Sequence, residues 1–217
     1  MSRRCLMALA LVTSNYEAHL TAGTKYERDC AERAKCWYES VFGTSDLHTI
    51  SESKLVLGLT KLLAKDFYID PEVWGTDLRT GKRLRIDAVL TPKRPEDWPD
   101  PLVRFGFEFK ALNKQRPQNI LRQAIDYRYT KWDDYGFLTI IMAPPLQLHD
   151  GELRGELVAF IGALSIGELW FRNRGYGHWT TSCDLVMSIG GTKVWSSVYG
   201  PTNKAGYAHG VNRAGSQ

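Results

Sequence analysis

The 217-residue sequence has few cysteines, no long hydrophobic run and little excess of charge of either sign. No stretch approaches the roughly 20 apolar residues of a membrane helix, so we expect no membrane partner. The four cysteines form no CxxC pair, which disfavours a disulfide framework or a zinc site and favours reduced, buried thiols in a cytoplasmic protein. No glycine-rich phosphate loop with its lysine is present, so ATP hydrolysis is not expected. The formal charge of +4 is compatible with a polyanionic partner but does not demonstrate one.

Length and a hydrophobic content of 43% predict one domain over residues 1–199, followed by a flexible tail at 200–217. The apolar residues 5–12 are interpreted as a core segment, because they are too short for a signal peptide. Apolar spacing predicts helices at 23–42, 51–65 and 117–129, and strands at 67–74, 83–90, 102–111 and 137–143, with short strands at 168–172 and 193–199. This order predicts an α/β fold in which helices flank a mixed sheet.

Two of the predicted strands have distinctive residue patterns. Pro71 interrupts 67–74, which indicates an edge strand or a kink. In 83–90 the apolar residues alternate, which predicts one shared face for the following set: Leu84, Ile86, Ala88 and Leu90.

Charged residues interrupt two of these apolar strands. Asp87 lies within 83–90, and 20 residues separate it from Glu108 in the next strand. Glu108 and Lys110 are two apart and project from one face, whereas Phe107 and Phe109 point to the other. Carboxylates attract a hard Mg²⁺ or Mn²⁺ ion, which activates water, and a lysine can orient or deprotonate that water or offset negative charge. This arrangement suits phosphodiester hydrolysis.

A solvated strand face can carry an acid–x–lysine pattern by chance. Here each charged residue interrupts a strand whose other face is strongly apolar, which favours a functional site over a solvated face. With that placement, the chain resembles the PD-(D/E)XK nuclease superfamily, and Ile86 stands where the motif classically has proline. The resemblance implies a restriction-endonuclease-like fold. It also implies Mg²⁺ binding by Asp87, Glu108 and the Phe109 carbonyl, and a catalytic role for Lys110.

Two further motifs extend the resemblance, which covers residues 23–143. Gln123 and Tyr127 match the QxxxY motif of RecB-like members, on the helix after the Lys110 strand, and could reach the site or the DNA backbone. Gly23 to Glu27 resembles the GxxxE opening of Holliday-junction resolvases and nominates Glu27 as a third acid. Glu32 and Glu72 are rival candidates. The iron–sulfur cluster of some relatives is not expected, because three cysteines precede the motifs and one follows, unlike the family pattern.

Basic residues surround these motifs and predict contacts with DNA phosphates, although a solvated face balanced by acids explains any single one equally well. The candidates for DNA binding are Arg85, Lys114, Arg122 and Arg128, together with Tyr127.

The sequence thus predicts a Mg²⁺-dependent deoxyribonuclease of a phage, a mobile element or a repair pathway, acting in the cytoplasm, or in the host cell's if phage-encoded. Endonuclease and exonuclease action, and double-stranded, single-stranded and branched DNA, all stay open. RNA is not excluded, and a homodimer is left open. The competing hypotheses are a catalytically inactive nucleic-acid-binding protein that keeps the fold, and an interaction protein with a coincidental motif.

Overall fold

The computed structural model describes residues 25–44, 49–111, 117–143, 161–173 and 183–202. The helices whose two ends both lie within these residues are α3 (Lys25–Phe42), α4 (Glu52–Leu63), the 3-10 helix η2 (Pro95–Asp97) and α5 (Pro117–Arg128). The strands are β1 (Phe67–Asp77), β2 (Arg83–Pro92), β3 (Phe105–Phe109), β4 (Thr130–Trp132), β5 (Thr139–Ala143), β6 (Gly167–Asn173), β7 (Cys183–Ile189), β8 (Thr192–Ser196) and β9 (Gly200–Pro201).

All the strands join one curled mixed sheet in the order β4-β1-β2-β3-β5-β6-β7-β8-β9. The neighbours β3–β5 and β5–β6 are parallel, and the other pairs are antiparallel. The strands at the two edges, β4 and β9, are only three and two residues long.

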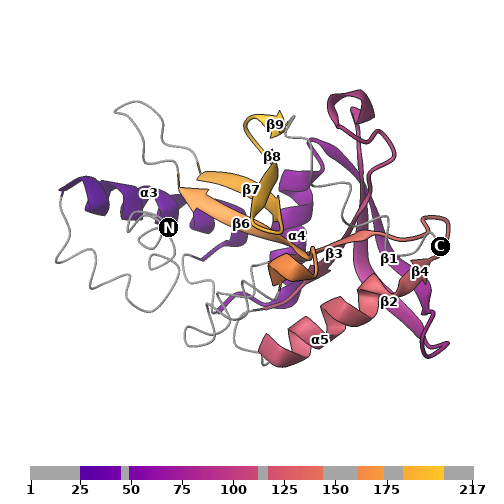
Figure 1. Cartoon of the computed structure of the whole chain (residues 1–217). Coiled ribbons are helices and arrows are strands. Elements are labelled where there is room, and N and C mark those ends of the chain that lie inside the picture. Colours follow the sequence, from indigo (N-terminus) through magenta and orange to yellow (C-terminus); the bar gives the residue numbers. More distant parts are fainter. Residues whose placement is uncertain (1–24, 45–48, 112–116, 144–160, 174–182, 203–217) are drawn as a thin grey trace.

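Helices cover the two faces of the sheet, so the fold is a mixed α/β arrangement (Figure 1). On one face α3 and α4 pack on the three phenylalanines of β3 and on β7 and β8. On the other face α5 contributes Ile120, Ala124 and Tyr127 to a second apolar layer with β5. Ser51 caps α4 by accepting a hydrogen bond from the Lys54 backbone N–H at 3.3 Å. The position of α5 over β3 is what brings its polar side chains to the charged residues of that strand.

The predicted order of helices and strands is confirmed from α3 to β3 and again at α5 and β5. Three strands were not predicted: the short strands β4 and β9, and β7, which forms a long antiparallel pair with β6. Gly200 and Pro201 pair with β8, so the loose tail that we expected from Gly200 does not begin there.

The expectation of buried thiols is wrong for Cys36, whose side chain is exposed. The reason is helical geometry. Tyr38 and Phe42 turn toward the core, and a residue two positions before Tyr38 lies on nearly the opposite side of the helix. In the part of the chain that the structure describes, no helix is long and apolar enough to cross a membrane. The apolar segment 5–12 and the predicted tail after Thr202 lie outside that part.

Candidate active site

The site is built where β2 and β3 stop pairing through their backbones. The antiparallel register runs from Leu90 opposite Phe105 to Ala88 opposite Phe107. One residue further, at Asp87, the pairing ends, and the Phe109 backbone N–H donates to Asp87 Oδ2 at 2.8 Å. A carboxylate thus takes the place of a strand carbonyl. The gap between the strands is therefore lined by charge.

Strand β2 changes the face that it turns to the core at the same residue. Leu84 and Ile86 pack in the layer under α5, whereas Ala88 and Leu90 pack toward α3 and α4. The prediction that these four residues share one face is therefore wrong, although the alternation is regular on each side of Asp87.

Strand β1 changes face at the matching level. Ile69 packs toward α3 and α4, whereas Val73 packs under α5. Between them lies Glu72, whose φ of 54° is in the left-handed region that few residues other than glycine adopt. This kink agrees with the expectation from Pro71. Both strands twist together beside Asp87, because neighbouring strands must keep their register.

Glu108 is almost completely buried, with 1% of its surface exposed. Its Oε1 atom lies 2.5 Å from Lys110 Nζ and accepts a hydrogen bond from Gln123 Nε2 at 2.7 Å. Its Oε2 atom is buried and has no hydrogen-bond partner among the described residues. Burial and the negative charge of Asp87 raise the pKa of Glu108 to about 7, although the Lys110 ammonium opposes the shift. A buried carboxylate with one unsatisfied oxygen can accept a cation.

The α5 pair Gln123 and Tyr127 secures Glu108 from the helix side. Gln123 Nε2 also donates to Tyr127 Oη at 2.5 Å, and Tyr127 Oη donates to the Arg85 carbonyl at 2.7 Å. Tyr127 is buried and its hydroxyl is bonded inside the protein, so it reaches the site, the first of the two places predicted for it, and its contact with DNA stays a prediction. Burial, followed by the charge of Glu108, raises its pKa, so the phenol stays protonated.

Burial also raises the pKa of Asp87, while the Phe109 N–H and the Lys110 charge work against the shift. A third carboxylate, Glu52 at the start of α4, adds to the rise. Burial acts to lower the pKa of Lys110, but the charges of Glu108, Asp87 and Glu52 outweigh it and raise the pKa.

The sequence prediction missed Glu52 because it looked for the third acid elsewhere. Among the nominees, Glu27 belongs to α3, but its side chain lies outside the description. Glu32 is exposed, and Glu72 forms an ion pair with Arg85. The available signal was the helix cap, since an acid directly after Ser51 marks a helix start. Nothing local, however, says that this helix start faces Asp87.

The carboxylates of Asp87 and Glu108 are the donors that a divalent cation would find at this site. Among the described side chains, no three of the types His, Cys, Asp and Glu cluster closely enough to hold a metal. Asp87 and Glu108 therefore offer a two-carboxylate set. Such a set fits Mg²⁺, which keeps several waters and uses one or two protein carboxylates. The unsatisfied Oε2 of Glu108 agrees with this fit.

Three arginines near the motifs form ion pairs with acidic side chains. Arg85 contacts Glu72 at 2.9 Å, Arg83 contacts Asp133, and Arg79 contacts both Asp77 and Asp126. Of the other DNA-binding candidates, Arg122 is exposed, Arg128 is half-buried, and Lys114 lies outside the description. Contacts of these residues with DNA therefore stay a prediction.

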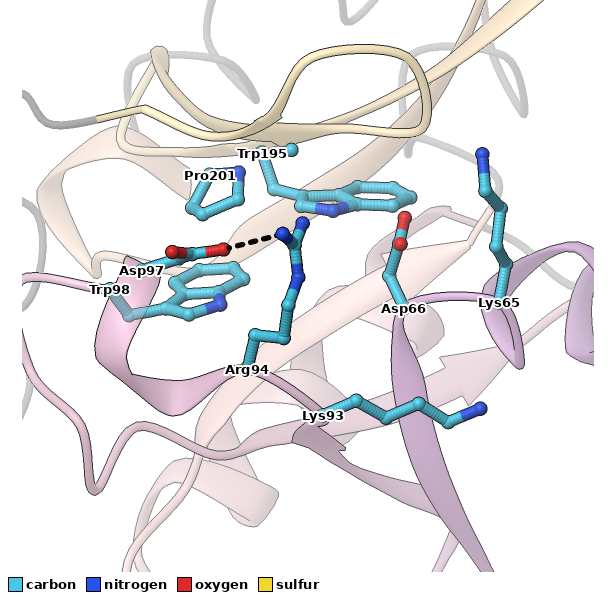
Figure 2. A pocket seen from close by; sticks show the side chains of 9 residues that line it. Lys65, Asp66, Lys93, Arg94, Asp97, Trp98, Trp195 and Pro201 are labelled. Carbon is cyan, nitrogen blue, oxygen red and sulfur yellow. Dashed lines mark ion pairs between the residues drawn. The ribbon is translucent and has the colours of Figure 1, made fainter.

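A pocket of about 220 Å³ lies at the other end of α4 and β2 (Figure 2). Three of its charged residues make contacts within the protein. Arg94 points toward Trp195 and pairs with Asp97 at 3.2 Å, and Lys93 Nζ donates to the Ala64 carbonyl at 2.6 Å. Lys93 follows Asp87 by six positions along β2 and its end, a distance of about 20 Å. The pocket is thus separate from the carboxylate site.

No protein-family model, curated protein or solved structure matches this chain. The interpretation of the site therefore rests on its own residues.

Proposed function

We propose that this protein is a metal-dependent nuclease of the PD-(D/E)XK type, with a restriction-endonuclease-like fold, that hydrolyses DNA phosphodiester bonds. One observation carries the proposal. Glu108 is buried beside Asp87 with an unsatisfied oxygen and a pKa raised to about 7, at the point where two strands separate. A divalent cation would supply the missing interaction at Glu108 Oε2 and neutralise charge on both carboxylates.

In this proposal Asp87 and Glu108 hold Mg²⁺ or Mn²⁺, which when bound lowers the pKa of its water and neutralises charge on the phosphate. Gln123 fixes Glu108 by bonding the Oε1 atom, which leaves Oε2 for the cation. The proposal includes the Phe109 carbonyl as a further oxygen ligand of the cation. Its N–H fixes the Asp87 carboxylate in place.

Lys110 has two possible roles, to deprotonate the attacking water or to orient it and offset negative charge. The charge of its side chain favours the second role. While Asp87 and Glu108 hold no cation, their charges raise the pKa of Lys110 and keep the ammonium protonated, a state that does not suit it to accept a proton from water. It can instead donate a hydrogen bond to the attacking water and offset negative charge that develops on the phosphate. We therefore assign Lys110 to orientation and charge stabilisation.

The test is cleavage of plasmid DNA and of labelled linear, single-stranded and branched DNA, with RNA in parallel, in Mg²⁺, Mn²⁺ or EDTA. We expect metal-dependent cleavage that Lys110→Ala reduces by at least about 100-fold, as loss of a group that stabilises developing charge does. Lys61→Ala, an exposed lysine of α4, is the matched control and should cleave normally.

Two results would count against the proposal. Wild-type rates in both Asp87→Ala and Lys110→Ala would show that the site is elsewhere. Binding of nucleic acid without cleavage in every metal would favour an inactive protein that keeps the fold.

A further inference from the structure

An exposed aromatic side chain lies beside the candidate site. Trp74 in β1 is a large apolar side chain, and it is 48% exposed. Arg85 is its direct partner across the β1–β2 pair, and the Arg85 guanidinium lies 6.0 Å from the centre of the ring. The positively charged guanidinium of Arg85 therefore lies over one face of an exposed aromatic ring.

The backbone beside this pair has an unusual conformation that local stability does not explain. Glu72 has a φ of 54°, and its Oε1 atom lies 2.9 Å from Arg85 Nη1. Both side chains are largely exposed, and exposed ion pairs contribute little to stability. Unusual backbone conformations that are not offset locally concentrate at functional sites. Glu72 orients Arg85 above Trp74.

The pair is also close to the reacting groups. Arg85 precedes Asp87 by two strand residues, about 7 Å, and Trp74 lies across from Arg85 at about 5 Å. The carbonyl of Arg85 accepts the Tyr127 hydroxyl, so the same hydrogen bonds that hold Glu108 also fix the backbone of Arg85.

We propose that Trp74 and Arg85 form a platform on which an unpaired base of the substrate stacks, next to the phosphate that is cleaved. The inference rests on the proposed nuclease function and adds its substrate class: single-stranded nucleic acid, or the frayed end of a duplex. A base inside a duplex has both faces covered by its neighbours, whereas an unpaired base has a free face for an aromatic ring. Such stacking tolerates any base sequence.

The test compares cleavage of a labelled single-stranded oligonucleotide with cleavage of a blunt duplex of the same sequence. Wild type should prefer the single strand. Trp74→Ala should raise KM for the single strand by about 5- to 100-fold, the range measured for loss of one stacked base, with little change in kcat. Trp74→Phe should restore most of the affinity, because it keeps an aromatic face.

Tyr129→Ala is the matched control. Tyr129 is 47% exposed and has the Arg79 guanidinium 4.4 Å above its ring. Its carbonyl accepts the Leu78 N–H, which places it beside a residue four positions along the chain from Trp74, or about 13 Å away. We expect Tyr129→Ala to leave KM unchanged. Melting curves of both variants show whether either has lost its fold.

Failure of this inference and failure of the proposed function give different results. If wild type cleaves and Trp74→Ala keeps the wild-type KM, the platform is wrong and the nuclease stands. If wild type cleaves nothing, the nuclease is wrong. The platform is then judged by binding of a fluorescent thymidine oligonucleotide to Lys110→Ala with Ca²⁺. Weaker binding after Trp74→Ala alone supports it, and equal losses in Trp74→Ala and Tyr129→Ala, or none, overturn it.

Discussion

Asp77 and Glu108 are buried carboxylates of the same sheet, and their surroundings shift their pKa values in opposite directions. Asp77, at the end of β1, accepts hydrogen bonds from the backbone and guanidinium of Arg79 and from the Thr80 hydroxyl. Hydrogen bonding to Arg79 lowers its pKa to about 2. Burial beside a second carboxylate raises the pKa of Glu108 to about 7.

The contrast separates a structural carboxylate from one suited to binding. Both oxygens of Asp77 have donors, so the carboxylate closes the β1–β2 turn and needs no further partner. Glu108 has donors on Oε1 only, and Oε2 is buried without one. Because an unsatisfied buried oxygen costs free energy, a ligand that supplies the missing interaction is favoured.

The largest expected effect is on cleavage. Glu108→Gln should reduce metal-dependent cleavage by roughly 100- to 1000-fold, because it removes the charge that holds the cation and fixes Lys110. Asp77→Asn should cleave at close to the wild-type rate and melt at a lower temperature. Initial rates and melting curves of the two purified variants measure this. An equal loss of cleavage in both would remove the distinction between the two carboxylates.

The next effect is the dependence of stability on pH without metal. Folded Glu108 keeps its proton up to about pH 7, whereas the unfolded chain releases it near 4.5. Wild type should therefore lose about 3 kcal/mol relative to Glu108→Gln as pH rises from about 4.5 to 7, with no further loss above. Asp77 has the opposite sign. Its contribution is complete above about pH 3.8 and disappears as pH falls toward 2. Urea unfolding in EDTA at a series of pH values measures both dependences. A difference in unfolding free energy between wild type and Glu108→Gln that does not change with pH would contradict the raised pKa of Glu108.

Metal binding should reverse the cost at Glu108. Mg²⁺ at a hundredfold excess over its Kd should stabilise wild type by about 2.7 kcal/mol. The stabilisation should be larger at pH 8 than at pH 6, because the cation competes with the Glu108 proton. Thermal melts with Mg²⁺ or EDTA measure it. Asp77→Asn should respond like wild type and Glu108→Gln should not; a response in Glu108→Gln would place the metal elsewhere.

The smallest effect is expected at Tyr127, which positions Glu108 through Gln123. Tyr127→Phe removes the hydrogen bond to Arg85 and should cost about 1 kcal/mol of stability. It should also shift the pH profile of cleavage, which loss of stability alone would not do. Tyr135→Phe is the control, since it removes a surface hydrogen bond to Asp70. Identical pH profiles in all three proteins would limit Tyr127 to packing.

Local patterns in the sequence were enough to predict much of the site. The two-residue spacing placed Glu108 and Lys110 together, and the helical spacing of Gln123 and Tyr127 placed both toward β3. These relations depend only on the period of one strand or one helix.

The parts that sequence reasoning missed depend on partners distant in the chain. The change of face at Asp87 involves Glu72 in the neighbouring strand, whose backbone conformation has no signal in residues 83–90. Glu52 reaches Asp87 only because α4 packs across the phenylalanines of β3. Tertiary packing, which no single periodicity encodes, sets both.

The kink at Pro71 and Glu72 also affects how copies of this protein meet. β4 pairs with β1 only at Gly75–Asp77, so among the described residues no strand covers Phe67–Val73 on that side of the sheet. Pro71 has no N–H to offer there, and the turned backbone at Glu72 interrupts the flat row that an added strand would need. The distortion beside the candidate site therefore also protects the molecule from aggregation by strand addition. A dimer that used this border of β1 would be built from side-chain contacts instead of a continued sheet.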